Sequence, residues 1–423
     1  MELSAAERRM LAGEEGHAAR RSMEILVALG EIYGARRLLE VGSVQIAGVS
    51  YDNLGEAGLE FLEEMATDGR ARVLATLNPA GIDVESYLEL GIDEGFAAQQ
   101  RRVLAAFGRM GVIPSCTCTP YLVGNLPRFG QRLAWSESSA VCFANSVLGA
   151  RTNREGGPSA LAAALTGRTP EYGLHLDEAR QAEVLVEVEG PLRDETDYGV
   201  LGAALGKRLG PRIPLLRGCG GADLEALKSL CASIATFGGT ALVHLEGVTP
   251  EPCAIPAERL VLGRAELEQT RAELEPGPGE IDFVSVGCPH LSLGELRRVA
   301  ELLDGKQVRL ETWVHVARPL KQLGDRAGYT RTIEAAGARF ACDTCLVVAP
   351  IAGRFRGLVT SSAKALYYAR AKHRLPAWLR PLEECLRIAC EGDGGRAERG
   401  GERGGERGVE RGGERGGERE VDR

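Results

Sequence analysis

The sequence predicts an α/β protein whose parallel sheets are flanked by helices. Between residues 282 and 348, strand-like apolar segments alternate regularly with amphipathic helical ones. Parallel neighbours need a crossover connection, usually a helix, so this alternation favours a parallel sheet. Glycine contributes 55 of the 423 residues and aromatic side chains only 5%, which suits an α/β enzyme with many tight turns. The length allows two or three domains.

The first part of the chain, residues 1–280, is predicted to form an N-terminal α/β region. Helical patterns occur at 52–69 and 95–111, and short apolar strands at 72–81 and 238–250. A Pro- and Gly-rich stretch around 274–282 follows, and such breaks mark domain boundaries. We therefore place a boundary after residue 280.

Residues 281–390 are predicted to form a C-terminal βαβ domain. Its strands and helices are expected, in chain order, at 282–290, 292–303, 308–317, 329–340 and 341–348. The first helix opens on Ser292 with Glu295 three residues later, which is a capping-box pattern. Ligands gather at the C-terminal ends of parallel strands, and Cys288 stands at such an end.

The C-terminal stretch 391–423 is a Gly-Glu-Arg repeat with almost no apolar residue. Such a segment cannot bury enough apolar surface to offset the entropy of ordering, so we expect a disordered tail. The net charge of −8 argues against a broad basic face and against nucleic-acid binding. We expect a cytoplasmic protein, because neither a secretory signal nor an apolar run of membrane-spanning length is present.

Three places in the chain present cysteines near a strand end or a turn. They are "SCTC" with Cys116 and Cys118, "GCPH" with Cys288, and "CDTC" with Cys342 and Cys345. Proline follows closely in the first two, and it biases its predecessor toward an extended conformation. The other six cysteines have surroundings that indicate no role: Cys142, Cys219, Cys231, Cys253, Cys385 and Cys390.

Several chemistries fit these cysteines. A zinc ribbon would pair two C-x-x-C motifs at short range, and this chain has one C-x-x-C and a distant C-x-C. A redox pair would open a helix, whereas Cys345 leads into a strand-like segment. An iron–sulfur cluster held by distant loops, inert buried cysteines and a disulfide of the hyperthermophile kind stay open, with zinc or a redox pair as weaker fits.

Two turns and one helix start are candidate anion sites. Gly48, Val49 and Ser50 offer backbone N–H groups and a hydroxyl, and Asn78 with Pro79 follows a predicted strand. The alternative for each is an ordinary turn.

Lys364 lies in "TSSAKALYYAR", a pattern that predicts the start of a helix with two hydroxyl side chains. The N-terminus of a helix can bind an oxyanion, and a lysine there would strengthen such a site. Here the alternative is an ordinary helix cap.

Further polar residues surround the first cysteine turn in sequence. Glu137 and Ser138 follow it closely and are expected to line the same cavity. Arg151 or Arg154 could bind a carboxylate bidentately or form a structural salt bridge. His175 and His290 are candidate proton carriers, with a satisfied structural histidine as the alternative for each.

Several long motifs together resemble a known family. They are "VQIAGVSYDN", "SCTCTPYLVGNLP", "GCPHLSL", "DTC", "SSAKALYYAR" and the long block "WSESSAVCFANSVLGARTNREGGPSALAAALTGRTPEYGLHLDE". The chain is identified on these motifs, over residues 1–390, as similar to the aconitase X family, and to the large, catalytic subunit of its two-subunit form.

The resemblance implies an aconitase-like multi-domain α/β fold and an iron–sulfur cluster held by three cysteines. By motif position the ligands are Cys118, Cys288 and Cys345, with Cys116 or Cys342 as replacements for their neighbours. The cluster is expected to be of the 4Fe–4S type, with 2Fe–2S as the alternative.

The implied activity is that of a hydro-lyase that dehydrates (R)-5-phosphomevalonate to trans-anhydromevalonate 5-phosphate in isoprenoid biosynthesis by the mevalonate pathway. The resemblance implies substrate-binding roles for the two turns and for Lys364. With Glu137 and Ser138, which follow the first cysteine turn, the candidate substrate-binding set is Gly48, Val49, Ser50, Asn78, Pro79, Glu137, Ser138 and Lys364.

The resemblance also implies a partner and a base. A small swivel-domain subunit is expected to contribute a catalytic serine, and Ser361 and Ser362 are the alternatives within this chain. Two rival functions stay open: dehydration of cis-3-hydroxy-L-proline by the same logic, and a non-catalytic cluster-binding protein. A phosphate pocket around residues 48–50 and 78–79 would distinguish the first rival.

Overall fold

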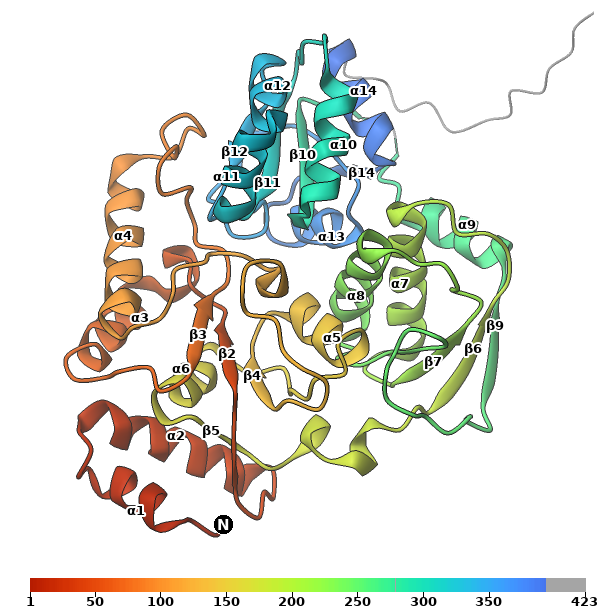
Figure 1. Ribbon diagram of the computed structural model, residues 1–423. Coiled ribbons are helices and arrows are strands. Elements are labelled where there is room, and N and C mark those ends of the chain that lie inside the picture. Colours follow the sequence, from red (N-terminus) through yellow and green to blue (C-terminus); the bar gives the residue numbers. More distant parts are fainter. Residues whose placement is uncertain (278, 393–423) are drawn as a thin grey trace, which may run out of the picture.

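The computed structural model describes residues 1–277 and 279–392. The described residues form parallel sheets with helices packed against them, as predicted (Figure 1). Of the predicted tail, residues 393–423 lie outside the described residues. Within the described part of the chain, no helix combines the length and apolar character needed to cross a bilayer.

The N-terminal part is built on a three-stranded parallel sheet in the order β3-β2-β4. A short antiparallel pair, β1 with β5, lies beside it against α2. The strands of these two sheets are β1 (Leu38–Glu40), β2 (Ser43–Ile46), β3 (Leu74–Leu77), β4 (Leu133–Trp135) and β5 (Arg168–Pro170). The helices are α1 (Ala5–Ala12), α2 (His17–Ile32), α3 (Tyr51–Met65), α4 (Glu94–Arg109), α5 (Ser138–Ser146) and α6 (Gly157–Thr166).

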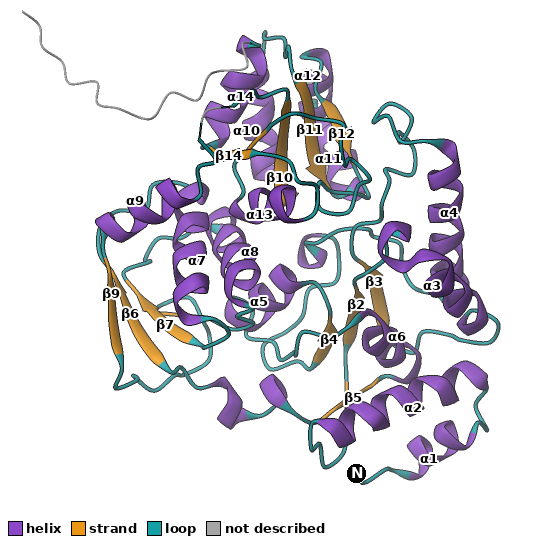
Figure 2. Cartoon of the chain, turned by 180° about the vertical axis from the view of Figure 1, so that it is seen from behind, coloured by secondary structure: helices purple, strands orange, loops and turns teal. Residues whose placement is uncertain are grey.

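A second parallel sheet follows in the order β8-β7-β6-β9. Its strands are β6 (Val184–Val188), β7 (Pro214–Arg217), β8 (His244–Leu245) and β9 (Arg259–Leu262). The accompanying helices are α7 (Glu195–Leu209), α8 (Leu224–Gly238) and α9 (Arg264–Glu273). Apolar side chains of α5 join this core, because α5 packs on α8 between the two sheets (Figure 2).

The third sheet has five parallel strands in the order β12-β11-β10-β13-β14. They are β10 (Phe283–Leu291), β11 (Glu311–Val316), β12 (Arg339–Ala341), β13 (Leu358–Thr360) and β14 (Ala377–Leu379). The helices are α10 (Leu293–Leu303), α11 (Arg318–Ala327), α12 (Tyr329–Ala335), α13 (Ala363–Ala371) and α14 (Leu382–Glu391). The predicted capping box is confirmed, since Ser292 and Glu295 bond reciprocally at the start of α10.

One predicted strand is wrong. The segment 341–348 was expected to be extended, but β12 ends at Ala341 and Cys342 begins a loop. The amide of Cys342 donates to the Asp83 carboxylate (2.8 Å), and Asp343 has a left-handed φ of 58°. A non-glycine residue with that φ cannot continue a strand, so Cys345 lies in a loop at the C-terminal end of the sheet. The strands expected at 72–81 and 238–250 are also shorter, as β3 and β8.

A shared apolar core fixes the three parts of the chain against one another. It combines Ile82 and Ala97 from the N-terminal part, Val200 from α7, and Phe283 and Trp313 from the third sheet. Burial of this kind contributes roughly 25 cal/mol per Å² of apolar surface. The loops that carry the cysteines therefore meet between parts that are packed together.

Candidate active site

Three thiols from distant segments lie together where the N-terminal part meets the third sheet. Cys118 lies in the loop after α4, Cys288 near the end of β10, and Cys345 in the loop after β12. The backbone N–H of His290 donates to the sulfur of Cys118 (3.2 Å), which joins segments 172 residues apart. Burial, then Glu137 and the sulfurs of Cys345 and Cys288, raise the pKa of the Cys118 thiol. We call these three residues the three-thiol group.

The other two thiols of this group are affected in the same way. Burial and the neighbouring Cys288 raise the pKa of Cys345 to about 12. Burial raises the pKa of Cys288 as well, against the opposing effects of Lys364 and a hydrogen bond from Ser362. Without a metal these sulfurs are therefore neutral thiols at pH 7, whereas a bound metal deprotonates a coordinating thiol.

Cys116 and Cys342, which we call the flanking cysteines, face a different network. Burial dominates the raised pKa of both thiols, and their next influences are Asp343, Asp83 and Arg318 rather than the three-thiol group. Arg318 starts α11 and binds Asp83 (2.6 Å) and Asp343 (2.5 Å). The structure thus separates the two cysteines of each motif into two environments.

Lys364 and Glu137 form a buried ion pair beside the three-thiol group. Burial opposes the lysine's charge, but Glu137 and the sulfurs of Cys288 and Cys118 raise the pKa of Lys364 above its ordinary value. Burial likewise disfavours the charged carboxylate, yet Lys364 and two further donors hold the pKa of Glu137 below its usual range. Those donors are the Ser139 hydroxyl (2.5 Å) and the Ala140 amide (2.7 Å). Both groups are charged at pH 7.

The two predicted turns are held together by a residue that sequence reasoning missed. Gln100 of α4 is fully buried, and its amide nitrogen donates to the Val49 carbonyl (2.9 Å). Its amide oxygen accepts from Tyr51 (2.9 Å) and Gly81 (3.0 Å). A lone glutamine on the apolar face of a helix is the only sequence signal of this role. The turns 48–50 and 78–79 therefore form one unit.

This pair of turns is joined to the Cys345 loop, and it contains one buried oxygen atom that accepts no hydrogen bond. The Ser50 hydroxyl donates to the Val348 carbonyl (3.2 Å), and Ala80 pairs with Thr344. The side-chain oxygen Oδ1 of Asn78 is buried and has no hydrogen-bond partner. Buried polar atoms are nearly always paired, so this oxygen has an unused capacity to accept a hydrogen bond. Gly48, with φ of 80°, turns the chain where the space for a Cβ is open.

The candidate serines have separate surroundings. Ser362 caps α13, accepting from the Ala365 amide (3.1 Å), and its hydroxyl is near enough to Cys288 to lower the pKa of that thiol. Ser361 lines a small cavity of about 20 Å³ together with Cys288 and Lys228. Ser138 is buried at the start of α5, next to Glu137.

The remaining candidates are not brought to the three-thiol group. Arg151 pairs with Asp177 (2.5 Å) and donates to the His175 carbonyl (3.3 Å). Arg154 forms a backbone bridge with Trp135. His175 is buried, and neither ring nitrogen has a partner. His290, in contrast, lies inside the group.

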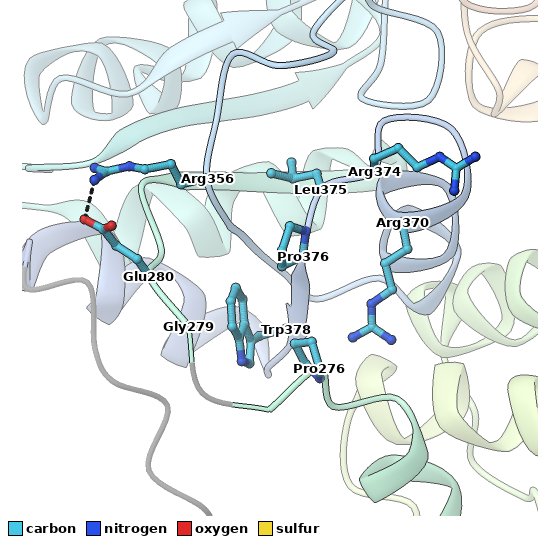
Figure 3. Close-up of a pocket in the computed structure, with 9 residues that line it drawn as sticks. All are labelled: Pro276, Gly279, Glu280, Arg356, Arg370, Arg374, Leu375, Pro376 and Trp378. Atoms are coloured by element: carbon cyan, nitrogen blue, oxygen red, sulfur yellow. Dashed lines mark ion pairs between the residues drawn. The ribbon is translucent and has the colours of Figure 1, made fainter.

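A surface pocket of about 390 Å³ lies elsewhere on the third part of the chain (Figure 3). Figure 3 shows Trp378 and Arg370 beside it, with Arg356 paired to Glu280 (2.7 Å) at its edge. None of the candidate residues above lines it. We therefore treat the three-thiol group, and not this pocket, as the candidate site.

The donor set of the three-thiol group is compatible with an iron–sulfur cluster. Among the described residues, no three His, Cys, Asp or Glu side chains are close enough to hold one metal ion. The thiolates of a cluster bind separate iron atoms, so they need not meet at one point, and soft sulfur ligands select such clusters. The site fits that cofactor class.

The fold and this site define an aconitase-like α/β protein with three cysteines at a junction of its parts. The chain belongs to the aconitase X family: models of the first, second and third aconitase X domains match residues 1–178, 182–272 and 281–391. This confirms the resemblance and the fold class seen in the sequence. Membership also indicates an iron–sulfur cofactor.

Similar proteins and a solved structure support membership of the same family. The phosphomevalonate dehydratase large subunit of Methanocaldococcus jannaschii is 45% identical over 92% of this chain and 100% of its own length. The cis-3-hydroxy-L-proline dehydratase of Pseudomonas aeruginosa is 36% identical over 94% of this chain and 71% of its own. The crystal structure of Thermococcus kodakaraensis aconitase X in its holo-form matches with a TM-score of 0.86 at 44% identity, over 92% of this chain and 100% of that one.

Proposed function

We propose that this chain is the large subunit of a hydro-lyase that dehydrates (R)-5-phosphomevalonate to trans-anhydromevalonate 5-phosphate in the mevalonate pathway. The convergence of Cys118, Cys288 and Cys345 carries the proposal, because it supplies a thiolate site beside charged and polar groups. Support for the substrate comes from four large subunits at 44–46% identity and a fifth at 38%, against 36% and 32% for two cis-3-hydroxy-L-proline dehydratases.

The three-thiol group would hold the cluster, of the 4Fe–4S type. Three protein thiolates leave one of four irons without a protein ligand, and such an iron supplies Lewis acidity to a departing hydroxyl group. The flanking cysteines are assigned a structural role, since Arg318 and its carboxylates surround them.

The chain's own residues would bind and orient the substrate. Lys364 offers a buried positive charge for an anionic group of the substrate, and Glu137 holds that ammonium in place. Asn78 Oδ1 is a free buried acceptor that suits a substrate hydroxyl. The turn at 48–50 gives backbone N–H groups for the second anion, at a glycine where space is open.

Removal of the C2 proton needs a base, because that proton is only weakly acidic. The hydroxyl of Ser362 already serves a helix cap and contacts Cys288, which makes it a poor acceptor. We assign the base to a small swivel-domain subunit, and the name "large subunit" borne by the relatives is consistent with such a partner.

The test is an anaerobic assay. The chain is reconstituted with iron and sulfide and assayed with and without the small subunit of phosphomevalonate dehydratase from the same organism. We expect dehydration of (R)-5-phosphomevalonate only with the small subunit, and none of cis-3-hydroxy-L-proline. Turnover of the proline substrate would transfer the assignment to the rival activity. A cluster-loaded complex that turns over neither compound would favour the alternative that this chain is a non-catalytic cluster-binding protein.

A further inference from the structure

His290 touches all three cysteine-bearing segments at once. It belongs to the Cys288 segment, two residues along β10, and its backbone N–H donates to Cys118 Sγ (3.2 Å). Its ring nitrogen Nδ1 lies 3.0 Å from the hydroxyl of Thr117, beside Cys118. Its other ring nitrogen Nε2 lies 3.0 Å from the carbonyl oxygen of Thr344, beside Cys345.

We propose that His290 is a positioning residue that sets the spacing of the three-thiol group before any cluster is bound. The proposal deepens the proposed function and rests on it, because the spacing matters for a cluster that three separated segments must hold together.

The ring has one arrangement that satisfies both contacts. A carbonyl oxygen only accepts, so Nε2 carries the hydrogen and donates to Thr344. Nδ1 then accepts a hydrogen bond from the hydroxyl of Thr117. The oxygen of that hydroxyl in turn accepts from the Thr119 amide (3.2 Å). Both ring nitrogens are therefore used by neighbouring loops, and none is left for a substrate proton. The proposal therefore adopts the second interpretation stated from the sequence, a satisfied structural histidine.

A second histidine, His315, packs beside the His290 ring. His290 is fully buried, and the ring of His315 lies nearly parallel to it at a centroid distance of 6.5 Å. His315 is in turn fixed on β11 by the hydroxyl of Ser285, which lies 2.9 Å from Nε2. Groups that orient metal ligands through hydrogen bonds typically contribute 10–100-fold to metal affinity.

The chain offers a matched control. His175 is also buried, at 2% exposure, but its ring has no hydrogen-bond partner and so joins no cysteine segment through a hydrogen bond. His290→Phe removes both ring contacts at similar volume, and His175→Phe makes the same chemical change elsewhere. His290→Gln restores one donor, and Thr117→Val removes the Nδ1 partner while keeping the histidine.

The first measurement uses apo-protein. The rate of alkylation by iodoacetamide is measured at each cysteine by peptide mass spectrometry. We expect His290→Phe to speed the reaction at Cys118, Cys288 and Cys345 by about 10-fold, the order expected from the loss of two buried hydrogen bonds. The buried Cys142 and Cys231, which lie in another core, should react at the wild-type rate and report that the fold is intact.

The second measurement uses the reconstituted protein. The rate of iron loss to a chelator is followed by visible absorbance. We expect about 10–100-fold faster loss for His290→Phe, a smaller increase for His290→Gln, and the wild-type rate for His175→Phe. If His290→Phe does not fold, the rate of iron loss from Thr117→Val tests the proposal instead, and we expect that rate to exceed the wild-type rate.

Wild-type rates in both measurements for His290→Phe, or for Thr117→Val where that variant decides, would overturn the proposal. So would equal effects of His290→Phe and His175→Phe. If the wild-type chain takes up no cluster, the proposed function fails, but the alkylation rates still decide whether His290 positions the thiols.

Discussion

The two cysteines of each motif sit only two or three residues apart, yet they lie in opposite environments. Cys118 and Cys345 belong to the three-thiol group with Cys288, beside the Lys364–Glu137 pair. Cys116 and Cys342 face Arg318 and its carboxylates. The first environment brings soft sulfur ligands from three segments together, whereas the second is a closed salt-bridge network.

The backbone explains how neighbours separate. Cys116 and Asp343 both have left-handed φ values, of 44° and 58°, and each stands two residues before a member of the three-thiol group. Non-glycine residues in this conformation are uncommon and are often found at functional sites. The turn that each produces directs one cysteine to the junction and leaves its neighbour in the salt-bridge network.

The largest effect is expected from removing one thiol of the three-thiol group. Cys288 has no neighbouring cysteine that could replace it, so Cys288→Ser should abolish stable cluster binding. Loss of Lewis-acid assistance is worth several kcal/mol, and each 1.36 kcal/mol is tenfold in rate. We expect activity of the reconstituted complex to fall by about 10³-fold. Activity above a tenth of wild type, measured under anaerobic conditions, would contradict this.

The next effect concerns the charged pair beside the thiols. Lys364→Met leaves the Glu137 carboxylate buried without its partner, and such a change costs about 3–5 kcal/mol of unfolding free energy. Urea unfolding of the apo-protein measures it. The double variant Glu137→Gln with Lys364→Met removes both charges and should recover most of the loss. An equally unstable double variant would show that packing, not charge, is responsible.

A third prediction extends the comparison to the histidines. Burial, with Arg132, Arg180 and Arg151 nearby, lowers the pKa of His175 from 6.5 to about 4. Above pH 6.5 the ring is neutral whether the chain is folded or unfolded, and it contributes nothing. Between pH 6.5 and 4 the unfolded chain binds a proton that the folded chain does not, so stability is lost as pH falls.

From pH 7 to pH 5 this histidine alone should cost about 2 kcal/mol of unfolding free energy. The His175→Phe variant should lose less stability than wild type over the same interval, by that amount. Urea unfolding at the two pH values measures the difference. Equal losses in the two proteins would show that His175 is not held neutral.

The smallest effect tests the serine beside the thiols. Ser362 caps α13, and replacing a cap serine by alanine costs about 1 kcal/mol of stability. We expect Ser362→Ala to lower the unfolding free energy by that amount while kcat of the complex changes less than about tenfold. A loss of several orders of magnitude in kcat would assign the base to this chain rather than to the small subunit.

Local patterns predicted the fold well where local interactions decide it. The strand at 282–290 and the helix opening on Ser292 appear as β10 and α10, because apolar alternation and a capping box act within a few residues. The strand expected at 341–348 failed because its end depends on Asp83, which is 259 residues from Cys342. No pattern of letters near the cysteine carries that contact.

The site was predictable as residue types and not as an arrangement. The motifs indicated three candidate cysteine ligands, but they did not show that Gln100 joins the two turns or that His290 joins three segments. Both residues act through long-range hydrogen bonds, which the sequence does not encode as spacing. Their only local sign is a polar residue in an otherwise apolar setting.

The most direct test of the central claim compares the two environments within each motif. Iron and sulfide per chain are measured after anaerobic reconstitution of two matched pairs, Cys118→Ser with Cys116→Ser and Cys345→Ser with Cys342→Ser. We predict that the first variant of each pair loses the cluster and that the second retains the wild-type content. Wild-type iron and sulfide in Cys118→Ser and Cys345→Ser, with loss in their neighbours, would contradict the account.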